Sequence, residues 1–257
     1  MVGNCFSLQR EPDVAIRYFQ RALQIDPAFT YAHTLCGHEL VSNEDLDKAM
    51  KSFRTAILYD DRHYNAWFGL GCIFSRQEKL ELAEYHFRRA LGINSGSSAL
   101  ISHLSGVLAT LSQTTGEFSL ATPTYFMFIL HFMFAYSLLF LCFSSDPFAQ
   151  ENNSPGKEDK AQEALRLLTG GVQADPRNAQ LRFQRAHVLL NLAARLEMDG
   201  GDMVRNKASA NVATAGRTHV EMLEEACEEL VRVKELSPRE PYVYVVLGEV
   251  YPLKYTY

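Results

Sequence analysis

The stretch HYNAWFGLGCIFSRQEKLELAEYHFRRAL (residues 63–91) decides the fold. Its second half places Ala83, Phe87 and Ala90 at i, i+4 and i+7, which is one stripe of an α-helix. Gly71 lies twelve residues before Ala83 on a preceding helix, at a point where a side chain would collide with the partner helix. The stretch therefore predicts two helices packed closely against each other.

The same columns recur upstream with a constant period of 34 residues (37 − 3 and 71 − 37), as the step from Gly3 to Gly37 and from Gly37 to Gly71 shows. The four columns are Gly3, Gly37 and Gly71; Ala15, Ala49 and Ala83; Phe19, Phe53 and Phe87; and Ala22, Ala56 and Ala90. A repeat of this length is one helix pair that buries its apolar face only against its neighbours. We expect helices over residues 13–26, 30–42, 46–58, 64–76 and 80–92, with Phe53 filling the space between two units.

The repeat pattern continues along the rest of the chain with two interruptions. The expected organisation is repeats over 1–112 (the first truncated, the fourth begun), an insertion over 113–159, a continuation over 160–197, a disordered loop over 198–217 and a truncated continuation over 218–257. The sixth unit is expected to stop at Pro252, within its first helix. The predicted fold class is all-α: a right-handed superhelical solenoid of paired antiparallel helices.

Composition excludes several classes of function. The 257 residues carry 25 basic and 30 acidic side chains, a net charge of −5, which gives no basic face for nucleic acid. The five cysteines form no CxxC pair, which disfavours a disulfide scaffold or a zinc ribbon. The eight histidines have no metal-ligand spacing, and the chain has neither a phosphate-binding loop nor a nucleophile elbow. We expect no catalytic residue, no cofactor and no metal.

Residues 125–143, YFMFILHFMFAYSLLFLCF, form an apolar run in which His131 is the only strongly polar side chain. Three interpretations stay open: a membrane span, a buried apolar loop, and translated non-coding sequence. Two observations disfavour a span. No Lys or Arg occurs between Arg89 and Lys157 to anchor its ends, and a single crossing would separate the two helices of one repeat.

A repeat array of this kind offers a binding surface, because the first helices of successive units line one concave wall. Helix positions two, five, nine and twelve face that wall, and a carboxylate at position ten points partly away from it. The candidate groove residues are Asn4, Ser7, Tyr31, Thr34, His38, Glu39, Asn65 and Phe68, flanked by Val41, Cys72 and Ser75. Aromatic, amide and hydroxyl groups in this arrangement suit an extended peptide.

The columns resemble the tetratricopeptide repeat (TPR). The motifs GNCFSLQRE (residues 3–11), HYNAW (63–67) and QEKLELAEYHF (77–87) also resemble the cell-division-cycle TPR scaffold subunits of the anaphase-promoting complex, a ubiquitin ligase. That resemblance implies a non-enzymatic scaffold in the nucleus and cytoplasm, bound to other subunits of the ligase. It also implies a groove that accepts C-terminal isoleucine-arginine tails of activators at Asn4 and its neighbours, and a homodimer formed through repeats upstream of this region.

Two alternatives remain beside this hypothesis. A TPR adaptor of the co-chaperone type would need charged donors in the groove for a chain-end carboxylate, and no groove lysine accompanies Asn4 and Asn65. A membrane-tethered TPR protein would depend wholly on residues 125–143.

Overall fold

A computed structural model describes residues 2–113, 157–202 and 218–254, and these residues form eleven helices and no strand. The helices of the first three units are α1 (Val2–Leu8), α2 (Pro12–Ile25), α3 (Thr30–Ser42), α4 (Leu46–Tyr59), α5 (Tyr64–Arg76) and α6 (Leu80–Ile93). The later ones are α7 (Ser98–Gln113), α9 (Lys157–Ala174), α10 (Ala179–Asp202), α11 (His219–Leu236) and α12 (Pro241–Lys254). The five helices predicted within residues 13–92 are confirmed to within one residue at each end.

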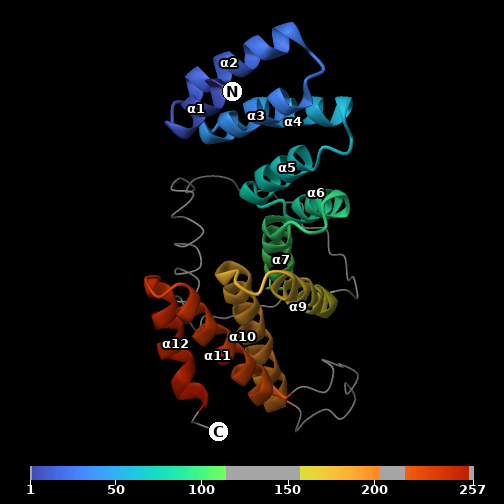
Figure 1. The fold of residues 1–257 in the computed structure, drawn as a ribbon. Coiled ribbons are helices and arrows are strands. Elements are labelled where there is room, and N and C mark those ends of the chain that lie inside the picture. Colours follow the sequence, from blue (N-terminus) through green and yellow to red (C-terminus); the bar gives the residue numbers. More distant parts are fainter. Residues whose placement is uncertain (1, 114–156, 203–217, 255–257) are drawn as a thin grey trace.

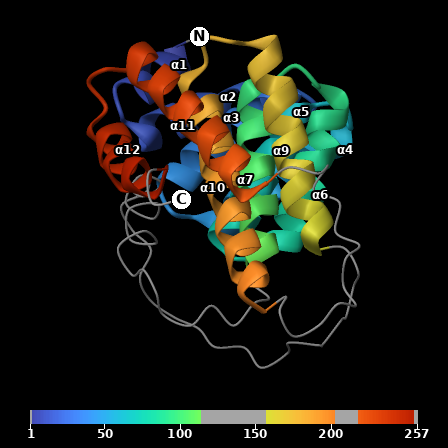
Figure 2. The same ribbon diagram turned by 90° about the horizontal axis from the view of Figure 1, so that it is seen from below.

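The helices stack as consecutive pairs from the N-terminal end to the C-terminal end (Figure 1). The pairs are α1–α2, α3–α4, α5–α6, α7–α9 and α10–α11, and α12 packs on the last of them. Seen from below, the pairs wind around a common axis instead of forming a straight rod (Figure 2). The predicted solenoid of paired helices is thus confirmed.

Two boundaries differ from the expectation. Helix α10 continues to Asp202, five residues into the stretch predicted as a disordered loop, and α12 runs through Pro252 to Lys254. The reason is that losing the repeat register removes packing partners but does not by itself end a helix. The apolar run 125–143 lies outside the described residues, and none of the helices that are described is long and apolar enough to cross a bilayer.

The glycine and phenylalanine columns form the contact that sets the spacing within each unit. A Cβ built on Gly37 would lie 2.6 Å from the ring of Phe53, and one built on Gly71 would lie 2.6 Å from the ring of Phe87. Phe53 also touches the next unit, because a Cβ on Gly69 would lie 2.4 Å from the same ring. Fully buried Phe53 therefore fills the space between two units, as the sequence predicted.

The turn inside each of the first three units ends its helix in the same way. Arg10, Glu44 and Glu78, which hold one column of the repeat, have φ of 60°, 61° and 58°. After α3 the Glu44 N–H donates to the Val41 carbonyl, and the Asp45 N–H donates to the Leu40 carbonyl. This is the Schellman arrangement, in which a residue in the left-handed region reverses the chain.

The turns between units are held by a side chain at the fourth position of the next first helix. His33, Trp67, Arg182 and Tyr244 each donate a hydrogen bond to the carbonyl of the residue six positions earlier, at 2.8, 2.8, 2.7 and 3.0 Å. Four different side chains make the same bond, so this position favours a large side chain with an N–H or O–H donor. In the fourth unit the position holds Ile101, which cannot donate.

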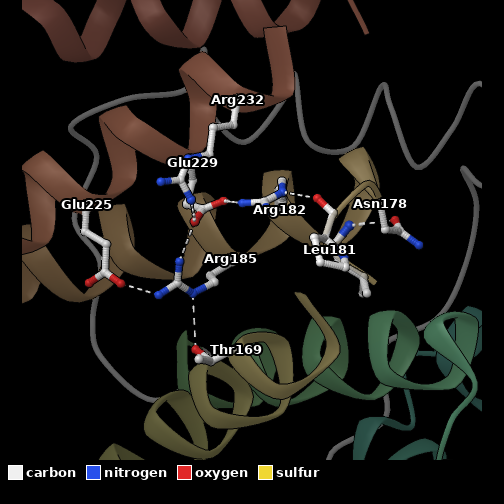
Figure 3. Close-up of polar contacts among 9 residues, drawn as sticks. Thr169, Asn178, Leu181, Arg182, Arg185, Glu225, Glu229 and Arg232 are labelled. Carbon is white, nitrogen blue, oxygen red and sulfur yellow. Dashed lines mark hydrogen bonds and ion pairs between the residues drawn. The ribbon is translucent and has the colours of Figure 1, made fainter. Parts of the chain in front are cut away.

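Ion pairs join the helices that follow the two insertions, α9 and α11, to their neighbours. Arg88 on α6 contacts Glu163 on α9 at 2.5 Å, and Lys160 contacts Glu84 at 2.9 Å. Between α10 and α11, buried Glu229 accepts from Arg182 at 2.6 Å and from Arg185 at 2.7 Å (Figure 3). Arg185 also pairs with Glu225 and donates to the Thr169 hydroxyl on α9 (Figure 3), so one guanidinium joins three helices.

Candidate peptide-binding groove

The candidate groove is built from consecutive first helices. Helix α3 contacts α5, and α7 contacts α10, so these first helices lie next to one another along one wall of the solenoid. Side chains join the helices directly: Ser7 on α1 donates to Glu39 on α3 at 2.5 Å. A longer bond of 3.5 Å runs from Arg76 on α5 to the Val41 carbonyl on α3. Of the predicted groove residues, Ser7 and Glu39 are thus brought together.

The N-terminal part of the wall differs in its detail from the prediction. Thr34 is 2% exposed, and its hydroxyl donates to the Thr30 carbonyl, so this side chain has no surface left for a ligand. Glu39 is 9% exposed and already accepts from Ser7. Asn4 and Ser7 are half-buried, while Tyr31 is 45% exposed with its ring 6.2 Å from that of Phe29. The accessible groups are therefore Asn4, part of Ser7 and Tyr31.

The central part of the wall is aromatic. His38 stands edge-on to Phe53 with 5.1 Å between ring centroids. Burial, followed by the neighbouring His63, lowers the pKa of His38, so its imidazole is neutral at pH 7. Half-buried Phe68 contacts the ring of His103 at 5.0 Å, and Asn65 lies half-buried one turn before it on α5.

Sequence reasoning missed His103, which is exposed on α7 beside Phe68 and Phe87. It sits at the sixth position of its helix, outside the four positions assigned to the groove. The signal was present in the sequence as the only histidine of the fourth first helix, but the assignment by position discarded it. Phe68 and His103 together extend the candidate groove across α5 and α7.

Two cysteines near this wall, Cys36 and Cys72, have raised pKa values. Burial raises the pKa of the Cys72 thiol to about 12. Burial, with the adjacent Glu39 carboxylate, raises the pKa of Cys36 to about 11. A thiolate is the reactive form, so both groups stay inert. Among the described residues no group of histidines, cysteines and carboxylates is placed to hold a metal ion.

Comparison with known proteins gives the repeat type. Residues 37–98 match the tetratricopeptide repeat family. The structure is similar to crystal structures of TPR proteins: YrrB, with a TM-score of 0.55 at 17% identity over 92% of this chain and 83% of that one, and TTC0263 of Thermus thermophilus, with a TM-score of 0.53 at 14% identity over 97% and 95%. These likenesses establish the fold. The helix pairs have the fold of tetratricopeptide repeats.

Curated relatives are more specific. The chain is 52% identical to protein bimA of Emericella nidulans over 100 residues, and 48% identical to anaphase-promoting complex subunit 3 of Schizosaccharomyces pombe over 101. It is 44% identical to cell division cycle protein 27 homolog B of Arabidopsis thaliana over 113 residues. These matches cover 39% to 44% of this chain but only 12% to 15% of the relatives. The resemblance to this type of TPR subunit is therefore confirmed for part of the chain.

Proposed function

We propose that this protein is a non-catalytic TPR scaffold that works as a subunit of the anaphase-promoting complex, in the nucleus and cytoplasm. The observation that carries the proposal is the identity of 44% to 52% with subunits of this type over about 100 residues. Such identity far exceeds that of the TPR structures with the same fold, so it reflects more than the repeat columns. The proposal includes binding to other subunits of the complex. It also includes a homodimer formed through repeats upstream of this region.

Within that function, the groove binds peptide tails of activators or other subunits. An isoleucine-arginine tail needs an apolar contact, hydrogen-bond partners for its backbone and an acceptor for the guanidinium. Phe68 and Tyr31 present aromatic surface, and the amides of Asn4 and Asn65 can both donate and accept. Glu39 supplies the carboxylate nearest in the sequence to these groove positions. It can accept from the guanidinium of a ligand only if its hydrogen bond with Ser7 breaks.

The test is fluorescence anisotropy of the full chain with a labelled peptide that ends in Ile-Arg. We expect a micromolar Kd, weakened by Asn4→Ala or Tyr31→Ala by about 1–2 kcal/mol, the size of a central contact. The control is Leu58→Ala on α4, a second helix, which removes a side chain that is 81% exposed. Equal binding of an amidated tail, or of a tail with Arg replaced by Ala, would show that the groove does not recognise this signal.

A further inference from the structure

A cavity that is separate from the candidate groove lies in the fourth unit, between the α6–α7 turn and α9. Its volume is about 530 Å³, within the range of about 300–1,000 Å³ that is typical of ligand sites. Leu91, Ile101 and Leu167 supply apolar surface, and Gly170 and Gly171 leave the backbone of α9 bare. Ser95, Gly96 and Ser98 of the turn form the facing wall. We call this cavity the unit-four hollow.

The hollow corresponds to the site that Trp67 fills in the third unit. Ala83 and Ala164 hold the same column in the second helices of the two units, and Trp67 corresponds to Ile101. Trp67 contacts Tyr85, His86 and Arg89, and it shares an apolar cluster with Ala90, Ile57 and Ile93. The residues at the same repeat positions around the hollow are Arg166, Leu167, Gly170, Gly171, Leu91 and Ala174, and all six line it. The unit-four hollow thus occupies the repeat position that the Trp67 side chain fills in the third unit.

Three replacements account for the open space. Isoleucine stands in place of Trp67, Gly170 in place of Arg89, and Ala174 in place of Ile93. The Ser95 carbonyl also lacks a donor, since Ile101 cannot make the bond that the fourth-position side chain makes in the other units, and no described residue replaces it. The hollow therefore combines apolar surface with an acceptor at the Ser95 carbonyl, and the carboxylates of Glu163 and Asp175 also line it.

We propose that the unit-four hollow binds a tryptophan side chain presented by a partner polypeptide. The indole ring fills the space of the missing side chain, and its N–H donates to the Ser95 carbonyl as Trp67 donates to Asp61. Exposed Arg166 on the rim supplies a cation for the face of the ring, as Arg89 lies 5.3 Å from the centroid of Trp67.

The experiment follows backbone amide shifts of the full chain during titration with N-acetyl-tryptophanamide. We expect saturable shifts at Gly96, Gly170 and Gly171 with a millimolar Kd, and at least fivefold weaker binding of N-acetyl-phenylalaninamide, which has no ring N–H. Ile101→Trp fills the hollow from within, so it should raise the Tm and abolish these shifts. No saturable shift at the three glycines would overturn the proposal.

A matched pair at Gly170 keeps the test decisive if Ile101→Trp does not fold. Nothing lies within 4 Å of a Cβ at this position, so both variants fit the helix. Gly170→Arg restores the residue type of Arg89 and closes the hollow, whereas Gly170→Ala leaves it open with a similar gain in helix propensity. Binding must survive in Gly170→Ala and fall at least tenfold in Gly170→Arg. Equal binding by both variants contradicts the site but leaves the groove proposal untouched.

Discussion

At the scale of single residues, the solenoid depends on glycines that admit a phenylalanine ring. Phe53 is enclosed by Gly37 of its own unit and Gly69 of the next, and it is fully buried. The column at Gly37 was visible from its constant period, which Gly3 and Gly71 share. Gly69 has no such period, because its role comes from the contact with the Phe53 ring of the neighbouring unit, so the repeat columns could not predict it.

We predict that Gly69→Ala destabilises the protein by about 1–3 kcal/mol, because its methyl group would lie 2.4 Å from the buried Phe53 ring. Alanine should otherwise stabilise a helix by up to about 1 kcal/mol relative to glycine. Gly92→Ala is the control, since nothing lies within 4 Å of a Cβ there. Chemical denaturation should show a lower free energy of unfolding for Gly69→Ala and a higher one for Gly92→Ala. A higher value for both would mean that the Phe53 ring shifts freely.

A second residue-scale prediction concerns pH. His86 stacks on Phe74 at 5.1 Å, and burial, followed by Arg54, lowers its pKa from 6.5 to about 4. Between pH 6.5 and 4 the unfolded chain binds a proton that the folded chain does not, so the free energy of unfolding falls as the pH drops through this window. His86→Phe should flatten that fall while keeping the stacked ring. The measurement is Tm at pH 7 and 4.5, and an unchanged difference between these values would contradict it.

At the scale of helices, the fifth unit replaces an apolar cluster by an ion network. Arg182 and Arg185 occupy the columns of Trp67 and Leu70, and Glu229 occupies that of His86. All three are buried (Figure 3). The burial of these charges could not be predicted from the sequence, because charged residues are mostly exposed unless they are paired, and the partners come from different helices.

We predict that Glu229→Gln destabilises the protein by about 3 kcal/mol or more, because it leaves the buried guanidinium groups of Arg182 and Arg185 without their shared carboxylate. Glu228→Gln on the same helix removes an exposed charge and should change stability by less than about 0.5 kcal/mol. Urea denaturation compares the two. Similar small losses for both would show that the network does not hold α10 and α11 together.

At the scale of the whole molecule, the constant period of the columns predicts helices well because each unit repeats the same packing problem. It predicts less where units differ. The left-handed residues Arg10, Glu44 and Glu78 were missed because glycine usually marks that turn. The burial of Thr34 and Glu39 was missed because groove positions were assigned by helix register alone. The unit-four hollow cannot be predicted from the fourth unit alone, because it becomes apparent only when the residues of that unit are compared with those at the same positions of the third.

The fourth unit gives the last prediction, since its two helices are separated by residues 114–156 in sequence but pack as a pair. Gln113 at the end of α7 and Ala161 in the first turns of α9 line the same small cavity, so a short connection can join the helices. Replacing residues 114–156 by about six should stabilise the protein by about 2 kcal/mol through the lower entropy cost of closing a shorter loop. A Gly/Ser linker of the original length controls for composition. Calorimetry should show a higher Tm for the short connection than for the long linker, and a lower Tm with loss of helicity would mean that 114–156 contribute packing of their own.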